Sequence, residues 1–322
     1  MRLLFHLSGE HPRLPRAEVE AVLEGEGIGY ELVLDDKPSR LLLMEIDGED
    51  YSFIERLALT RWVGLVVSTS NKIDMVADRV YEQIKNSRSF ALRCSEKIRM
   101  ELGRLLKDKG LFVDLDNPDN VIHCMKPKDT SYTCISLPLK KGFNQRAPNR
   151  RPFFHPTSIA PKTARFLVNL ARVGVGDTVL DPFCGTGGLL IEAGLMGLGI
   201  KGLDVDEAMV LGCRKNLRYY GIKGDIILGD ALQSEYRGVD AIVSDLPYGR
   251  SSYLTERNLD LFYRSFLDKA ANQVKQKGYV ICVLPQKIEY MKEGLKLVDR
   301  FELYIHKSLT REIYVYRKNR GF

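Results

Sequence analysis

The sequence predicts an α/β protein in which a doubly wound, mainly parallel sheet, beginning near Pro161, follows smaller α+β modules. Two observations predict the sheet. Apolar strands alternate with helices after Pro161, and acidic or glycine-rich turns follow several of these strands. Ligands on such sheets bind at the carboxyl ends of the strands. We therefore expect the functional site at these turns.

The first 68 residues read as strand, helix, strand, strand, helix, strand, which is the order of a ferredoxin-like unit. The predicted strands are 3–7, 30–34, 40–46 and 62–68, and the predicted helices are 17–23 and 52–59. A turn at 35–39 separates the middle strands. These elements predict a first domain over 1–68.

A second small domain is predicted over 69–140, followed by a basic, proline-rich linker over 141–160. The domain has predicted helices at 74–85 and 97–107 and predicted strands at 90–93, 121–125 and 132–137. Five prolines between 138 and 161 argue for extended chain with little packing. The run 137–165 carries seven Lys or Arg residues and no acid, and 85–110 carries eight against three acids. Such runs suit a phosphate backbone, although solvated surface is the alternative.

A third domain is predicted over 161–322. Its predicted helices are 162–172, 188–196, 207–220 and 259–276, and its predicted strands are 178–181, 200–204, 225–229, 241–245, 279–285, 302–308 and 312–317. Continuous apolar strands between helices indicate a parallel sheet covered on both faces.

Composition narrows the functional classes. A chain of 322 residues suits two or three domains of ordinary composition. The six cysteines form no CxxC pair, which favours free thiols in a reducing cytoplasm over zinc or disulfides. The apolar runs are too short to span a bilayer, and Met1 opens no charged leader. The histidines show no ligand spacing. We expect a cytoplasmic monomer without a metal or a membrane partner.

The segment Asp181-Pro-Phe-Cys-Gly-Thr-Gly-Gly188 follows the first strand of the third domain and opens a helix. Glycines let the backbone turn tightly and approach a ligand. We predict that Asp181, Gly185, Thr186 and Gly187 hold a nucleotide-like cofactor. The spacing fits neither the dinucleotide fingerprint nor the triphosphate loop, and a purely structural turn remains the alternative.

Acids follow the next two strands. Asp204 is placed to accept hydrogen bonds from ribose hydroxyls, and Asp230 from an adenine amine; a surface turn is the alternative for Asp230. Asp206 is expected to cap the following helix. Thr157, in the segment 153–157, is a further candidate beside the cofactor, although this segment equally suits a packed aromatic anchor.

The turn Asp245-Leu-Pro-Tyr-Gly249 is the predicted reaction site. An exocyclic base amine is a poor nucleophile because its lone pair is delocalised into the ring. Acceptors at Asp245 and at the carbonyl of Leu246 favour a pyramidal nitrogen, and attack on a sulfonium methyl then requires mainly alignment. Pro247 shapes the turn, and Tyr248 stacks on a base that has left its helix. These residues predict methyl transfer from S-adenosylmethionine to a base nitrogen. Cys184 lies in the glycine loop, so a cysteine nucleophile is disfavoured.

These motifs, together with Arg150-Arg-Pro-Phe-Phe-His-Pro-Thr-Ser158, resemble the archaeal tRNA (guanine-N2) dimethyltransferases that modify guanosine 10. The resemblance implies a seven-stranded Rossmann-like methyltransferase domain, preceded by a ferredoxin-like unit and a THUMP RNA-binding domain. It also implies S-adenosylmethionine as donor, and N2-methyl- and then N2,N2-dimethylguanosine as products.

The resemblance further implies that the THUMP domain holds the acceptor 3′ end of tRNA, while the linker and catalytic domain hold its body. Gly185, Gly187, Asp204 and Asp230 carry over as cofactor residues, and Asp245 and Tyr248 as residues that bind and stack the base. Leu246 departs from the family pattern Asp-Pro-Pro-Tyr, and we expect a looser turn there.

Two rival functions remain open from the sequence. The first is another amino-methyltransferase, acting on adenine N6 in DNA or on a different guanine in RNA, because an Asp-x-Pro-Tyr turn fits all of these. The second is a non-catalytic RNA-binding protein with a decayed enzyme domain. The acids at 204, 230 and 245 argue against decay.

Overall fold

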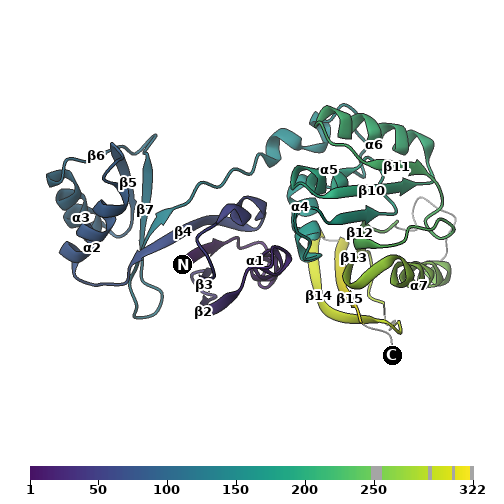
Figure 1. The fold of residues 1–322 in the computed structure, drawn as a ribbon, viewed down its shortest axis with the longest axis horizontal. Coiled ribbons are helices and arrows are strands. Elements are labelled where there is room, and N and C mark those ends of the chain that lie inside the picture. Colours follow the sequence, from purple (N-terminus) through teal and green to yellow (C-terminus); the bar gives the residue numbers. More distant parts are fainter. Residues whose placement is uncertain (248–255, 289–291, 307–308, 320–322) are drawn as a thin grey trace. The chain divides into compact units, whose positions relative to one another are not determined.

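The computed structural model describes residues 1–247, 256–288, 292–306 and 309–319 (Figure 1). Contacts divide the chain into two compact units. The N-terminal unit comprises residues 1–16, 28–55 and 59–140, and the C-terminal unit comprises residues 17–27, 56–58 and 141–322. Helix α1 (Leu14–Gly25) and the 3-10 helix η1 (Ser52–Arg56) contribute residues to both units.

The N-terminal unit contains one eight-stranded sheet in the order β2-β3-β1-β4-β8-β7-β5-β6. Its strands are β1 (Arg2–Leu7), β2 (Tyr30–Asp36), β3 (Leu41–Ile46), β4 (Thr60–Ser68), β5 (Ser89–Arg93), β6 (Phe112–Val113), β7 (Asn120–Met125) and β8 (Tyr132–Ser136). Helices α2 (Ile73–Ile84) and α3 (Glu96–Asp108) lie beside β5 and β6 (Figure 1). One sheet therefore includes the strands of both predicted small domains.

The two helices of this unit are amphipathic, which explains where they pack. In α2 the buried residues are Val76, Ala77, Val80 and Ile84, a spacing that places them on one helical face. They share a core with Phe90 and Ile122 of the sheet and with Leu102 and Leu106 of α3. Strand β6 was not predicted, because two residues with an exposed Phe112 carry no alternating pattern.

The C-terminal unit contains, within its described residues, a seven-stranded sheet in the order β11-β10-β9-β12-β13-β15-β14. Its strands are β9 (Thr178–Asp181), β10 (Gly199–Asp204), β11 (Asp225–Leu228), β12 (Val239–Asp245), β13 (Val274–Leu284), β14 (Leu295–His306) and β15 (Leu309–Lys318). Its helices are α4 (Pro161–Leu170), α5 (Gly188–Leu195), α6 (Glu207–Tyr219) and α7 (Glu256–Gln273).

The first five strands of this order are parallel, and β15 pairs antiparallel with β13 and β14. The chain runs outward from β9 to β11 and then returns to place β12 on the other side of β9. The point where the strand order reverses therefore lies between β9 and β12, where an α/β sheet of this kind binds its ligand. The predicted doubly wound sheet is confirmed.

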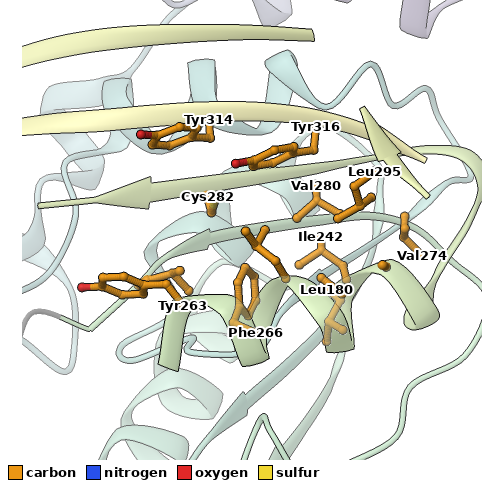
Figure 2. Close-up of a cluster of buried hydrophobic side chains, with 14 of the residues drawn as sticks. Leu180, Ile242, Tyr263, Phe266, Val274, Val280, Cys282, Leu295, Tyr314 and Tyr316 are labelled. Carbon is orange, nitrogen blue, oxygen red and sulfur yellow. The ribbon is translucent and has the colours of Figure 1, made fainter. Parts of the chain in front are cut away.

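The core of this unit explains why its strands are apolar without alternation. Leu180, Ile242 and Val280 pack against Tyr263 and Phe266 of α7 on one face of the sheet (Figure 2). Neighbouring strand residues, which point to the opposite face, are also buried: Val179, Ala241, Val243 and Ile281 are each 0% exposed. Both faces are thus covered, as the sequence predicts.

Several predicted boundaries were wrong. The strand predicted over 302–308 begins at Leu295 as β14, and the helix predicted over 52–59 is the 3-10 helix η1, which ends at Arg56. The helix predicted over 259–276 ends at Gln273, and β13 begins at Val274. The helical pattern of the sequence continues to the glycine at 278, but Val274 is 1% exposed and pairs with Val239 of β12. Pairing with the sheet therefore overrides local helical propensity.

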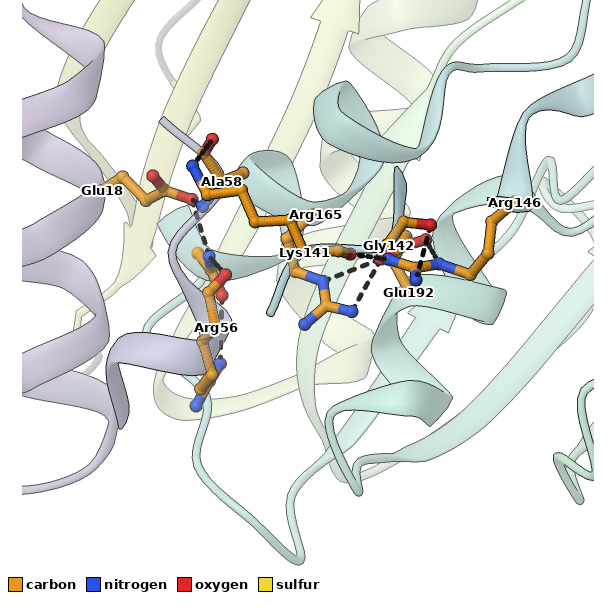
Figure 3. A network of polar contacts seen from close by, with 9 residues as sticks. Glu18, Arg56, Ala58, Lys141, Gly142, Arg146, Arg165 and Glu192 are labelled. Carbon is orange, nitrogen blue, oxygen red and sulfur yellow. Dashed lines mark hydrogen bonds and ion pairs between the residues drawn. The ribbon is translucent and has the colours of Figure 1, made fainter. Parts of the chain in front are cut away.

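The proline-rich segment is more folded than predicted. It contains the 3-10 helices η2 (Phe143–Arg146) and η3 (Pro148–Arg150). Glu192 of α5, 0% exposed, accepts from Arg146 Nε at 2.7 Å and from Arg165 Nε at 2.8 Å (Figure 3). Arg151 is also buried. The prediction that this basic run suits phosphates was therefore wrong for these three arginines. Two of them neutralise the buried Glu192, and Arg151 packs inside the unit.

Two pieces of the N-terminal sequence complete the C-terminal unit. Asn169 of α4 donates from Nδ2 to Glu18 Oε1 at 2.8 Å and to the carbonyl of Arg56 at 2.9 Å. The same Glu18 oxygen accepts from the backbone N–H of Ala58 at 2.8 Å (Figure 3). Both Glu18 and Asn169 are 0% exposed. Because buried polar groups need partners, these hydrogen bonds make the two segments part of the C-terminal unit.

Candidate active site

Four parallel strands deliver the predicted site residues to one edge of the C-terminal sheet. Asp181, Asp204 and Asp245 are the last residues of β9, β10 and β12. Asp230 follows β11 by two residues. The carboxyl ends of parallel strands meet at the same edge, so the structure brings these acids to one side of the sheet.

The glycine loop needs glycine at two positions for different reasons. Gly185 has φ +48°, and a Cβ there meets no atom of the described residues within 4 Å. Gly187 has φ +84° and caps α5, and a Cβ there lies 2.6 Å from Cys213 Sγ. Gly187 is therefore fixed by packing, whereas the space at Gly185 is open for a ligand to approach the backbone.

Asp204 holds this loop in place. Its Oδ2 accepts from the backbone N–H of Gly185 at 2.8 Å, and its Oδ1 accepts from the N–H of Asp206 at 3.0 Å. The N–H of Cys184 donates to the carbonyl of Leu203 at 2.7 Å, which ties the loop to β10 a second time. Asp206 accepts from Ala208 and Met209 as the N-cap of α6, which confirms that prediction.

Asp181 is 2% exposed and links β9 to β12 across the switch point. Its Oδ1 accepts from Ser244 Oγ at 2.7 Å and from the N–H of Phe183 at 3.2 Å. Burial raises the pKa of Asp181 to about 7; Asp204 and Asp245 add to this, and the two hydrogen bonds oppose it. Ser244 has no motif of its own and was missed from the sequence.

Residues 153–158 are held against the glycine loop by hydrogen bonds of Asn216 and of Ser158. Asn216 of α6 donates from Nδ2 to the carbonyls of Phe153 at 2.9 Å and Thr186 at 3.0 Å, and its Oδ1 accepts from the N–H of Phe153 at 2.9 Å. Thr186 Oγ1 lies 2.9 Å from Ser158 Oγ. The sequence did not single out Asn216, whose side chain bridges two predicted motifs.

Thr157 is next to this junction but is itself exposed. Its hydroxyl lies 2.8 Å from His155 Nδ1. Asp230 forms a turn after β11, where its Oδ1 accepts from the N–H of Leu232 at 2.8 Å and its Oδ2 from Gln233 Nε2 at 3.0 Å. The N–H of Gly229 donates to the carbonyl of Asp204 at 3.0 Å, which joins this turn to the neighbouring strand end.

The turn after β12 is anchored through Leu246. Its side chain is 1% exposed in the core beside Tyr263, and its N–H donates to the carbonyl of Val283 at 3.1 Å. A proline at 246 has no N–H to make this bond. The expectation of a looser turn is therefore not met at Leu246, and for the rest of the turn it stays a prediction. Tyr248 lies outside the described residues.

Two side chains distant in sequence complete this turn. Tyr263 donates from its hydroxyl to the carbonyl of Pro247 at 3.1 Å, and burial together with Asp245 raises the pKa of Tyr263 to about 12. Arg311 of β15 donates from Nη1 to Asp245 Oδ2 at 3.1 Å, and both side chains are 18% exposed. No local motif marks either residue, so sequence reasoning missed both.

Several other site types are not supported by the described residues. Within the ranges that the structure describes, there is no cluster of three or more His, Cys, Asp or Glu that could hold a metal. The six cysteines are free thiols, and a hydrogen bond with the Cys213 thiol, together with burial, raises the pKa of Cys184, so it is a poor nucleophile. None of the helices, over these same residues, is long and apolar enough to cross a membrane. A cavity of about 390 Å³ in the N-terminal unit, beside β4 and α2, contains no predicted site residue.

Comparison with known proteins identifies the class and then the family. Residues 148–297 match the family model described as RMKL-like, methyltransferase domain. The crystal structure of TrmN from Thermus thermophilus has the same fold, with a TM-score of 0.54 at 19% identity over 99% of this chain and 100% of that chain. The sheet order and the glycine loop thus define a Rossmann-like methyltransferase.

The sequence relatives are more specific. A tRNA (guanine(10)-N2)-dimethyltransferase of Methanothermobacter thermautotrophicus is 36% identical over 98% of this chain and 99% of that protein. Another, from Methanocaldococcus jannaschii, is 34% identical over 97% of this chain and 98% of that protein. The chain belongs to the tRNA (guanine(10)-N2)-dimethyltransferase family.

Proposed function

We propose that this protein transfers methyl groups from S-adenosylmethionine to the exocyclic N2 of guanosine 10 in tRNA, first forming N2-methylguanosine and then N2,N2-dimethylguanosine. One observation carries the proposal. The glycine loop, with space for a ligand at Gly185, follows β9, and the Asp245 turn follows the neighbouring strand β12, so both lie where the strand order reverses. Full-length similarity to enzymes with this name supports the choice of base and of tRNA.

The strand ends fit the donor. Open space above Gly185 admits a ligand against the backbone, and the carboxylates of Asp204 and Asp245, whose negative charge helps to raise the pKa of Asp181, favour a positively charged group. We assign the loop of Gly185, Thr186 and Gly187 and the exposed Thr157 to the methionine and ribose region. We assign Asp204 to the ribose hydroxyls and Asp230 to the adenine.

Asp204 keeps a capacity to bind ribose although both its oxygens accept backbone N–H groups, because each carboxylate oxygen has two acceptor positions. Asp181 is almost fully buried. We therefore assign it the role of fixing the loop. S-adenosylmethionine, when bound, supplies a methyl group on a sulfonium.

At the Asp245 turn the protein prepares the nucleophile. The Asp245 carboxylate and the Leu246 carbonyl accept the two hydrogens of the base amine, which favours a pyramidal nitrogen with an available lone pair. Because Leu246 is anchored by Val283 and the carbonyl of Pro247 by Tyr263, the acceptors are held in position before the base arrives. Asp245 then takes the released proton or polarises the amine until water takes it. Tyr248 is assigned to stack on the base.

For the tRNA, we propose that residues 69–140 act as a THUMP domain that holds the acceptor 3′ end, after a ferredoxin-like domain at 1–68. All eight Lys and Arg residues between 85 and 110 are exposed, unlike the inward-facing arginines of the 141–160 linker. Clustered exposed cations gain affinity by releasing counterions from phosphate. We propose a cytoplasmic monomer that contacts the tRNA body through the catalytic domain at 161–322 and exposed linker residues such as Arg150.

A panel of nucleic acids with methyl-labelled donor tests the proposal. We expect incorporation into a tRNA transcript with guanosine at position 10, and none when position 10 is adenosine. Incorporation into DNA but not into tRNA would overturn the proposal in favour of adenine N6 methylation. Replacing Lys97 and Arg99 with Gln should weaken tRNA binding and flatten its salt dependence while sparing donor affinity.

A further inference from the structure

The ion pair between Arg311 and Asp245 places a cation at the predicted base site. Arg311 belongs to β15, and β13 separates this strand from β12, so its side chain reaches across the end of β13. Nη1 lies 3.1 Å from Oδ2 of Asp245, and neither side chain is fully buried. Partly exposed ion pairs contribute little to stability, so stability alone is a weak reason for this arrangement.

The two side chains present their groups in a defined order. A carboxylate offers two acceptor oxygens side by side, and a guanidinium next to it offers a donor. The pairing edge of guanine reads, in sequence, two donors at the N2 amine and N1–H and one acceptor at O6. Two acceptors followed by one donor are therefore complementary to that edge.

We propose that Arg311 is the residue that recognises guanine, by donating to O6 while the Asp245 carboxylate accepts from N1–H and from the N2 amine. This inference rests on the proposed function, because it concerns the base held at the same turn. The second hydrogen of the amine points to the opposite side of the base, where the Leu246 carbonyl is assigned to accept it. Arg311 is thus a specificity residue that contacts the base beside the reacting nitrogen.

The arrangement also explains discrimination against adenine. Adenine presents its amine beside a ring N1 that carries no hydrogen and is itself an acceptor. Placed against Asp245, this N1 faces a carboxylate oxygen, and the guanidinium of Arg311 meets no O6. A site built to hydrogen-bond a particular group rejects an analogue without it more strongly than an apolar pocket does.

The test changes one atom of the base. In a tRNA transcript, 6-thioguanosine at position 10 keeps N1–H and the N2 amine but replaces O6 with sulfur, a weak acceptor. We expect kcat/KM of the unsubstituted protein to fall about fivefold or more on the thio transcript. Arg311→Met should lower kcat/KM on guanosine about 5- to 150-fold and show less than a twofold difference between the two transcripts.

Arg300→Met is the matched control. Arg300 lies on the neighbouring strand β14 and pairs with Glu312 at 2.9 Å, so its loss also removes an arginine–carboxylate contact from the same hairpin. This variant should keep the full preference for oxygen over sulfur. Arg311→Lys should keep part of the preference, because an ammonium also donates.

The outcomes are separable. If Arg311→Met retains the full sulfur penalty, or if the unsubstituted protein shows no penalty, Arg311 does not contact O6 and the inference is overturned. If Arg311→Met does not fold by thermal melting, Arg311→Lys takes its place, and an unchanged penalty in that variant contradicts the inference. An unsubstituted protein that methylates neither transcript contradicts the proposed function instead.

Discussion

The candidate active site has two halves, one at the ends of β9 and β10 and one at the end of β12, and they hold their acids in different ways. On the β9 and β10 half, Asp181 and Asp204 accept hydrogen bonds from backbone N–H groups and from a serine of the neighbouring strand. On the β12 half, Asp245 pairs with the side chain of Arg311. Asp181 is 2% exposed, whereas the Asp245 side chain is 18% exposed.

This difference separates acids with a structural role from the acid assigned to the reaction. A carboxylate that satisfies backbone N–H groups fixes the path of a loop, and its own position is fixed in return. A partly exposed carboxylate that pairs with an arginine, such as Asp245, can exchange hydrogen-bond partners when a base binds. We therefore assign the first half to holding the donor and the second to holding the nucleophile.

Removing the reacting acid should give the largest effect. Asp245→Ala should reduce methyl transfer to tRNA about 10³-fold or more, because the acceptor that orients the amine is lost, while donor affinity stays within about twofold. Asp240→Ala is the control, since Asp240 lies in β12 but accepts from the N–H of Thr178, the first residue of β9, at the opposite end of that strand from Asp181. Isothermal titration with the donor, beside initial rates, separates the two effects. An equal loss of donor affinity in Asp245→Ala contradicts the division between the halves.

The next effect concerns the helix that follows the glycine loop. Glu192→Gln should destabilise the protein by about 3 to 5 kcal/mol, because it leaves Arg146 and Arg165 buried without their anion. Glu235→Gln, whose partner Arg237 is 83% exposed, should cause no measurable change. Chemical denaturation checks both. Equal stability of the two variants would mean that α5 is not held by this network.

An alanine in the glycine loop should distinguish the effect of backbone strain on stability from the effect of a new methyl group on donor binding. Gly185→Ala and Gly221→Ala both place alanine at positive φ, and in the part of the chain that the structure describes no atom lies within 4 Å of either new Cβ. Both should lose about 1 to 2 kcal/mol of stability through backbone strain. Only Gly185→Ala should weaken donor binding, by about 10- to 200-fold, because its methyl enters the space assigned to the ligand. Equal donor affinities in titration would place the donor elsewhere.

The smallest effect is a pH dependence on the donor half. The folded-state pKa of Asp181 is raised to about 7, so the folded protein keeps this proton at pH values where the unfolded chain has lost it. Stability therefore falls as pH rises toward 7, by about 1 kcal/mol between pH 6 and pH 7. Asp181→Asn keeps an acceptor for Ser244 and should lose that part of the decline. Unfolding free energies at both pH values check this, and an identical decline in both proteins would show that Asp181 does not titrate there.

Much of the fold could be predicted because its signals are local. Apolar strands, helix periodicity and the Asp206 cap all lie within short windows, and the parallel sheet follows from their alternation. The glycine loop and the acids at 204 and 245 were found for the same reason. Each is a short motif directly after a strand.

The rest depends on partners that sequence does not reveal. Arg311 is 66 residues from Asp245, and Asn216 is 63 residues from Phe153. From the sequence, Leu246 in place of proline indicated a looser turn, whereas its burial and its hydrogen bond to the carbonyl of Val283 anchor this residue. The basic run at 137–165 looked like a phosphate surface because its internal partner, Glu192, lies on a later helix.

Mass spectrometry of nucleosides from tRNA treated with the purified protein and S-adenosylmethionine tests the central claim most directly. The account predicts N2-methylguanosine and then N2,N2-dimethylguanosine, both absent when position 10 carries adenosine. Methylated adenosine, or methylguanosine that persists in the adenosine-10 transcript, would contradict the assignment of the Asp245 turn to this guanine.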